Sequence, residues 1–96
     1  MRHECYVFFE TLGNKLKLNI ISRLKNEPMI VNELSKELNQ ERSKISHALI
    51  SLLDCGFVHV KKDGRKRIYS LNSDTILPLL DIMEIHTKRY CKKCKN

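Results

Sequence analysis

Two neighbouring groups of polar and basic side chains give this chain its clearest capacity for chemistry. The first group lies at the start of a predicted helix and consists of Gln40, Arg42, Ser43, Lys44, Ser46 and His47. The second group surrounds a predicted hairpin turn and consists of Lys61, Lys62, Arg65, Lys66 and Arg67. Amide, hydroxyl and imidazole groups can hydrogen-bond base edges, and Lys and Arg attract phosphates. The two groups therefore predict a surface that binds double-stranded DNA.

A helix over about residues 42–55 would carry the first group. Its apolar residues recur at helical spacing and form one stripe: Ile45, Ala48, Leu49, Leu52 and Leu53. The polar residues near the helix start lie largely off this stripe, so they are free to enter the major groove, where Gln40 could read an adenine. The alternative interpretation of these residues is an ordinary solvated helix face.

A β-hairpin over about residues 58–71 would carry the second group. Valines alternate with polar residues at its start, and Asp63-Gly64 is a strong signal for a two-residue turn. This turn would place Lys62 opposite Arg65. The apolar root of the hairpin would pack on the core, while the basic tip would contact the DNA backbone and the minor groove.

The remaining segments complete the order of elements. Further helices are predicted over four ranges: about 4–12, 15–25, 32–38 and 76–93. The chain is therefore expected to be mainly α with a small β-hairpin, in the order of four helices, a hairpin and a last helix. That order predicts a winged helix-turn-helix forming one domain over residues 1–96. Within it the helix-turn-helix covers about 31–55 and the wing covers 58–71.

The first and last helices carry more apolar surface than a small helical core needs. The residues concerned are Tyr6, Phe9, Leu79, Leu80, Met83 and Tyr90. Apolar surface without a partner in the chain is typical of an association site. We expect the helices over about 4–12 and 76–93 to form the interface of a homodimer.

Three of the cysteines gather toward the chain ends: Cys5, Cys91 and Cys94. Cys91 and Cys94 are three residues apart, so on one helix they would share a face and could clamp a soft metal. If the first and last helices pair, Cys5 would supply a further ligand. No cofactor is required, and the candidate metal is zinc or another soft divalent ion. A redox pair and an unliganded tail are open alternatives.

The composition is that of a folded, basic protein. The 96 residues include 18 Lys and Arg against 11 Asp and Glu, a net charge of +7, which favours a polyanionic partner. No apolar run approaches the roughly 20 residues needed to cross a bilayer, and no signal segment is recognised, so we expect a cytoplasmic protein. With no glycine-rich phosphate loop and no credible acid/base pair, an enzyme is not expected.

From about Phe8 to Leu80 the chain resembles the ArsR/SmtB family of winged-helix transcriptional repressors. The family's second-helix opening is echoed by Thr11-Leu12-Gly13-Asn14 and Lys17-Leu18-Asn19-Ile20-Ile21. Its recognition-helix and wing-turn patterns are met by Ser43, Ser46, Leu49, Leu52, Gly56, Phe57, Val58, Asp63, Gly64 and Tyr69. The resemblance implies a homodimer that binds a palindromic operator and represses, often releasing DNA when a metal binds.

Two metal motifs of that family are missing from this sequence. The Cys-x-Cys motif that opens the third helix in many members is replaced by Ile30-Val31-Asn32. The Asp-x-His pattern of the last helix is also unmet, since Asp74 is followed by Thr75 and Ile76, and His86 is the only histidine on that helix. Sensing through either familiar site is therefore not expected.

The predicted function is a sequence-specific DNA-binding transcriptional regulator, in the first instance a repressor. Any response to metal or to oxidation would come through the terminal cysteines. The alternatives are an architectural protein that binds DNA without sequence preference and a winged-helix protein-interaction module. Five cations on the wing argue against the interaction module, and the ratio of specific to non-specific affinity would separate the other two.

Overall fold

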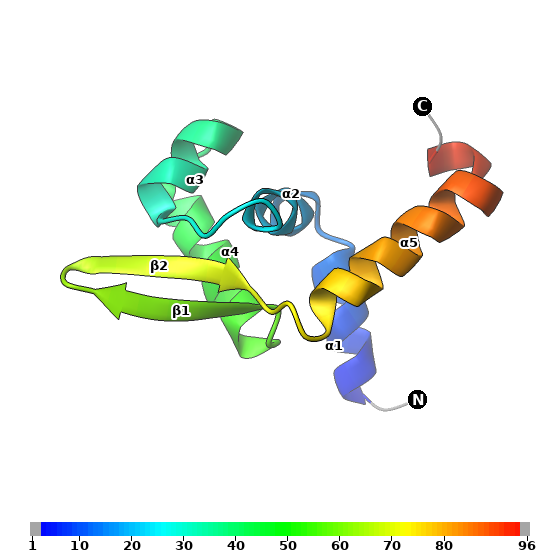
Figure 1. Ribbon diagram of the computed structural model, residues 1–96, viewed down its shortest axis with the longest axis horizontal. Coiled ribbons are helices and arrows are strands. Elements are labelled where there is room, and N and C mark those ends of the chain that lie inside the picture. The colour runs from blue at the N-terminus through cyan, green and yellow to red at the C-terminus, as the bar shows by residue number, and fades with distance from the viewer. Residues whose placement is uncertain (1–2, 95–96) are drawn as a thin grey trace.

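The computed structural model describes the backbone of residues 3–94 and the side chains of residues 6–93. The helices are α1 (His3–Leu12), α2 (Lys15–Leu24), α3 (Val31–Leu38), α4 (Arg42–Asp54) and α5 (Ile76–Tyr90), followed by a 3-10 turn η1 (Lys92–Cys94). The strands β1 (Val58–Asp63) and β2 (Lys66–Leu71) form an antiparallel hairpin between α4 and α5. The predicted order of elements is confirmed (Figure 1).

The turn between α3 and α4 is fixed by short polar side chains. Asn39 ends α3 in the left-handed conformation with φ 52°, which asparagine tolerates better than most residues. The Ser35 hydroxyl donates a hydrogen bond to the carbonyl oxygen of Gln40 across this turn. The two helices are thereby joined tightly, and α4 starts at Arg42 in a fixed direction.

The apolar stripes of α2, α3 and α4 meet in the core. Ile20, Leu34 and Leu49, one from each helix, have no exposed surface. Phe57, after α4, is also fully buried, and its ring stacks on that of Phe8 in α1 with the centroids 4.9 Å apart. Burying one such side chain contributes about 1.5–3 kcal/mol. The core therefore holds α4 firmly while its other face stays in solvent.

The register of the hairpin differs from the expected one. Gly64 and Arg65 are the two turn residues, so Lys62 lies opposite Arg67 and not opposite Arg65. Gly64 has φ 63°, and Asn39 is the one non-glycine residue among those described with a positive φ. This is the pattern of a type II′ turn, which needs a positive φ only at its first central residue. The expected two-residue turn over Asp63-Gly64 was wrong because the turn lies one residue further along the chain, where Gly64 supplies the positive φ at the first central position.

A backbone bridge outside the hairpin anchors its root. The Met29 backbone N–H donates to the Tyr69 carbonyl oxygen over 3.0 Å, and the Tyr69 backbone N–H donates to the Met29 carbonyl oxygen over 2.9 Å. Tyr69 also packs its side chain into the core beside Val58 and Leu71. The sequence did not reveal this bridge, because one residue leaves no alternating pattern. It ties the wing to the segment that leads into α3.

The last helix is shorter than predicted. It ends at Tyr90 and not near residue 93, because Cys91 adopts an extended backbone with φ −92° and ψ 100°. The 3-10 turn then covers Lys92–Cys94. Cys91 and Cys94 therefore do not share the face of one continuous α-helix, as had been expected.

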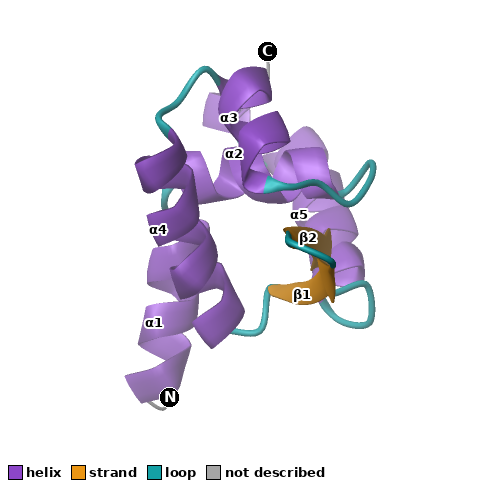
Figure 2. Cartoon of the chain, turned by 90° about the vertical axis from the view of Figure 1, so that its left-hand side faces the viewer, coloured by secondary structure: helices purple, strands orange, loops and turns teal. Residues whose placement is uncertain are grey.

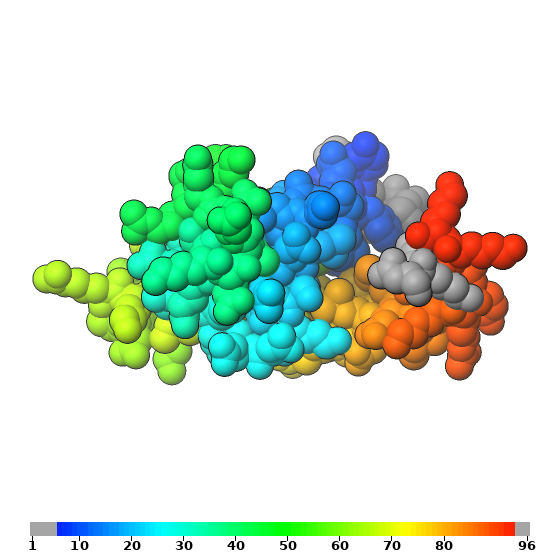
Figure 3. Space-filling view, turned by 90° about the horizontal axis from the view of Figure 1, so that it is seen from above, coloured from blue at the N-terminus to red at the C-terminus, as the bar shows by residue number. Residues whose placement is uncertain are grey.

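The wing lies at one end of an elongated molecule and α1 and α5 lie at the other (Figures 1 and 3). The extents along the three principal axes are 45, 33 and 22 Å. Surfaces at the two ends can therefore bind different partners at once. Within the described residues no helix is long and apolar enough to cross a membrane.

Candidate nucleic-acid interface

The exposed face of α4 carries the polar residues predicted to meet DNA. Ser43, Ser46 and His47 are exposed and recur at helical spacing, and Lys44 is exposed beside them. Ile50 continues the same face one turn further on and is 57% exposed. Ile50 was not among the residues predicted to meet DNA, because only polar and basic residues were considered for that face.

The wing and α4 border one open groove of about 390 Å³. It is lined by Ile30, Val31, Asn32, Ser46, Ile50, Arg65, Lys66, Arg67 and Tyr69. Figure 2, seen from the wing end, shows α4 beside the hairpin with α3 above them. The fold thus brings Ser46, from the first predicted group, to the same hollow as three cations of the second group.

A second hollow lies on the other side of α4, against the start of α2. Its lining includes Ser43, Lys44 and His47 from α4, together with Lys17 of α2 and Asn14, which caps α2. The Nζ atom of Lys17 donates a hydrogen bond to the Ser51 hydroxyl over 2.9 Å, which ties α2 to α4. One carboxylate, that of Asp54, also lines this hollow and offsets part of its positive charge.

The wing concentrates positive charge, and its one carboxylate is that of Asp63, which lies opposite Lys66. All five of its cations are exposed. The observed register sets Lys62 directly opposite Arg67, and like charges in that position repel each other. Among the described residues the ion pairs join side chains of α2, α3 and α5 or the Lys25 that follows α2, and none involves a wing cation. A bound polyanion would relieve this repulsion.

The two residues that flank the start of α4 lie in different settings. Gln40 is exposed in the turn between α3 and α4. Arg42 is exposed too, and its Nη1 atom donates a hydrogen bond to the Asn32 side-chain oxygen over 3.3 Å. Arg42 is thus partly occupied by a contact to α3, while Gln40 keeps its side chain available.

Comparisons with known proteins bear on what this arrangement is for. Residues 22–73 match the family model described as the sugar-specific transcriptional regulator TrmB. The HTH-type transcriptional regulator NmtR of Mycobacterium tuberculosis is 32% identical over 79 residues, which is 82% of this chain and 66% of NmtR. The transcriptional activator HlyU of Vibrio cholerae is 26% identical over 86 residues, 90% of this chain and 77% of HlyU.

Solved structures agree with the sequence comparisons. The structure of Vibrio cholerae HlyU superposes with a TM-score of 0.76 at 25% identity, covering 93% of this chain and 94% of that one. The homodimeric winged helix-turn-helix domain of Mb0332 from Mycobacterium bovis, a possible ArsR-family regulator, gives a TM-score of 0.84 at 15% identity, covering 97% and 86%. This last likeness shows the fold alone.

The chain belongs to the ArsR/SmtB family. It is a winged helix-turn-helix transcriptional regulator and not an enzyme.

In this ArsR/SmtB regulator, the positions of the two family metal motifs, at the start of α3 and on α5, are occupied by other residues. Residues 30–32 line the groove beside the wing. His86 is exposed on α5, with its ring 5.5 Å from that of Tyr90. Among the described residues no group of three or more His, Cys, Asp or Glu is placed to hold a metal ion.

The cysteine set predicted for this regulator falls mostly beyond what the structure describes. Cys91 is half-buried at the end of α5, whereas the side chains of Cys5 and Cys94 lie outside the described residues. Cys55, by contrast, is half-buried behind α4, with its sulfur 3.5 Å from the Thr11 hydroxyl of α1. That contact joins the end of α4 to the first helix.

The apolar residues predicted for the dimer interface of this ArsR/SmtB member divide into two sets. Tyr6, Phe9 and Tyr90 are exposed. The remaining three, on α5, are half-buried. Leu79 and Leu80 pack against the core, and Met83 lines a hollow with Leu18 and Ile21 of α2. Two residues outside the predicted set, Ile82 and Ile85, are 64% and 51% exposed on α5. The helix α5 therefore has apolar residues on two faces, and the predicted set lies mainly on one of them.

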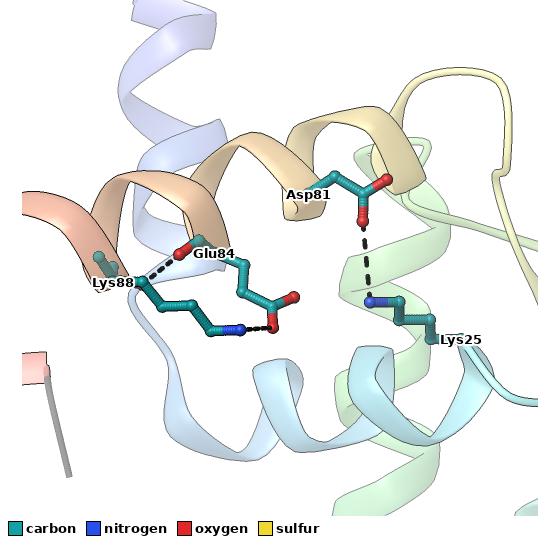
Figure 4. Close-up of polar contacts among 5 residues, drawn as sticks. Lys25, Asp81, Glu84 and Lys88 are labelled. Atoms are coloured by element: carbon teal, nitrogen blue, oxygen red, sulfur yellow. Dashed lines mark hydrogen bonds and ion pairs between the residues drawn. The ribbon is translucent and has the colours of Figure 1, made fainter.

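Two ion pairs fasten and order α5 of the regulator (Figure 4). The Lys25 ammonium lies 3.9 Å from an Asp81 oxygen, and the Lys88 ammonium lies 3.2 Å from a Glu84 oxygen. The hydrogen bond and the positive charge of Lys88, with a further contribution from Lys25, lower the pKa of Glu84 below its ordinary value. The glutamate therefore stays ionised to a lower pH than a free one.

Proposed function

We propose that the chain is a sequence-specific repressor that binds a palindromic operator as a homodimer in the cytoplasm. Helix α4 enters the major groove, where Ser43, Ser46 and His47 meet base edges, with Gln40 at its edge. Lys44 and Arg42 contact nearby phosphates. The wing contacts the flanking backbone and minor groove through Lys61, Lys62, Arg65, Lys66 and Arg67.

The observation that carries this proposal is the groove shared by α4 and the wing. A winged helix-turn-helix reads bases with one element and contacts phosphates with another, so both must face the same duplex. Ser46 and the wing cations Arg65, Lys66 and Arg67 border one hollow. The same end of the molecule therefore offers hydrogen-bonding groups flanked by positive charge.

The exposed apolar residues at the other end support the homodimer. Tyr6 and Phe9 on α1 and Ile82, Ile85 and Tyr90 on α5 together expose a large apolar area. The fold relative Mb0332 is described as homodimeric. A two-fold dimer presents two copies of α4, which matches an operator with two inverted half-sites.

Titration of the purified, reduced protein against DNA fragments flanking its own gene tests the proposal. We expect tight binding to one palindromic segment, with an affinity that falls as salt rises. Placing that segment between a promoter and a reporter gene then tests repression, which we expect to lower expression. HlyU is named an activator, so raised expression would overturn the repressor part alone. Equal, weak binding to every fragment would favour an architectural protein.

A further proposal is that zinc, or another soft divalent ion, controls the regulator through Cys5, Cys91 and Cys94. The Cys-x-x-Cys spacing supports it, as does the placement of α1 and α5 at the same end of the molecule. Three thiolates fit a soft ion, and a tetrahedral site would need one more ligand. Native mass spectrometry should show bound zinc, and zinc should weaken DNA binding. Rapidly reacting thiols with no bound zinc would contradict the proposal, and a disulfide between Cys91 and Cys94 would favour a redox sensor.

A further inference from the structure

Ile50 is an exposed apolar residue in the middle of the helix proposed to enter the major groove. Its side chain is 57% exposed, and it shares a helix face with Ser43, Ser46 and His47. The buried residues of α4 lie on the opposite side: Ile45, Ala48, Leu49 and Leu52. Ile50 is absent from the core and from the partly buried residues packed against it. Core packing therefore does not account for an isoleucine at this position.

Ile50 is also shared by the two hollows that flank α4. On one side it borders the groove with Ser46, Arg65 and Arg67. On the other side it borders the hollow that contains Lys44 and His47. A residue common to both hollows lies on the crest between them. With cations on each side to hold the two phosphate backbones, the crest is the part of α4 directed at the base edges.

We propose that Ile50 reads the C5 methyl group of a thymine in the major groove. Thymine presents an apolar group there that the other three bases lack, and an aliphatic side chain is the natural partner for it. The contact buries apolar surface on both molecules and involves no charge, so it adds sequence preference without adding general affinity for DNA. This inference rests on the proposed function, because it requires α4 in the major groove.

Deoxyuridine provides the test, because it differs from thymidine only in lacking this methyl group. A duplex is first selected by the wild-type protein from a random-sequence pool. Thymidine is then replaced with deoxyuridine at one position at a time, together with the symmetric position in the other half-site. At one such pair we expect the wild-type affinity to fall about fourfold for each methyl group, or about fifteenfold for the pair. With Ile50→Ala the same replacement should change the affinity by less than about twofold.

Val60→Ala is the matched control, because Val60 is another exposed aliphatic residue, on β1 of the wing. With Val60→Ala, the replacement of thymidine by deoxyuridine should lower the affinity as much as it does with the wild type. Ile50→Ala should keep the wild-type affinity for random-sequence duplex and its salt dependence, because no charge is removed. Unchanged circular dichroism would show that this variant remains folded.

The outcomes separate the inference from the proposed function. The inference is overturned if no replacement of thymine by deoxyuridine in the selected duplex lowers the affinity of the wild type more than that of Ile50→Ala. In that case the proposed function still stands. The same holds if Ile50→Ala binds the selected duplex as tightly as the wild type does. If the wild-type protein selects no sequence at all, the proposed function fails and the inference fails with it.

Discussion

At the scale of single residues, the wing cations are the simplest part of the account to test. Replacing Arg65 and Arg67 with alanine should weaken binding to every duplex by a similar factor. The slope of the logarithm of the binding constant against the logarithm of the salt concentration should become shallower by about 2 for each protomer, since two phosphate contacts are lost. Affinity measured at several salt concentrations checks this. Lys92→Ala with Lys93→Ala is the charge-matched control, because these exposed lysines lie at the other end of the chain, and its slope should not change.

Single residues were predictable where their chemistry alone fixes their position. The polar residues of α4 and the wing cations are exposed, as a charged or hydrogen-bonding surface must be. Ile50 was missed because only polar residues were expected to face DNA, although its spacing from Ser46 and His47 places it on their face. Ile82 was missed because the predicted interface followed another side of the last helix. Only the packing of neighbouring helices decides which apolar residues remain uncovered, and Ile50 and Ile82 are 57% and 64% exposed.

At the scale of elements, the turn of the wing has a clear structural requirement. Gly64→Ala should lower the free energy of unfolding by about 1–2 kcal/mol, because Gly64 has a positive φ that alanine adopts at a cost. Urea denaturation followed by circular dichroism measures the change. Asp63→Ala is the control and should have little effect, because Asp63 has no positive φ. A larger loss at Asp63 than at Gly64 would contradict the type II′ turn.

The last helix makes a prediction about pH. Lys88 lowers the pKa of Glu84 in the folded chain, so the ionised glutamate contributes stability above its unfolded-state pKa. That contribution is lost as the pH falls through the lower, folded-state pKa. Lys88→Gln should raise the pKa of Glu84 toward its ordinary value, as followed by an NMR titration of the carboxyl group. Lys92→Gln, beyond the end of α5, should leave it unchanged. An equal pKa in the wild type and Lys88→Gln would contradict the assigned cause.

Elements were predicted well where periodicity marks them. The four helices before the wing begin and end within a residue or two of the expected positions, because apolar stripes and boundary residues such as Asn39 define them locally. The hairpin register was wrong because Gly64 can supply a positive φ either as the second residue of a turn over Asp63-Gly64 or as the first residue of a turn over Gly64-Arg65. The early end of α5 at Tyr90 had no marker in the sequence, since the residues that follow are ordinary helix formers.

At the scale of the whole molecule, the exposed apolar surface of α5 should hold the proposed homodimer together. Replacing Ile82 and Ile85 with aspartate should convert the dimer to monomer, because buried carboxylates without partners are costly. Sedimentation equilibrium measures the change, and folding should persist because both side chains are exposed. Ile50→Asp, an exposed isoleucine at the other end, is the control and should remain dimeric. A dimer that survives the double substitution would place the interface elsewhere.

The arrangement of the whole molecule could be predicted only in part. The order of elements was enough to indicate a winged helix-turn-helix. The groove between Ser46 and the wing, the hollow formed by α2 with α4, and the Met29–Tyr69 bridge all depend on contacts between distant segments. Such contacts follow from packing and leave no local pattern in a sequence.

The most direct measurement of the central claim is the ratio of two affinities at one physiological salt concentration. One duplex is the segment that the protein selects, and the other has the same composition in scrambled order. We predict a ratio of about 10³ or more, with two protomers on the selected duplex. A ratio near one would contradict sequence-specific recognition by α4 and would leave only the electrostatic attraction of a basic protein for DNA.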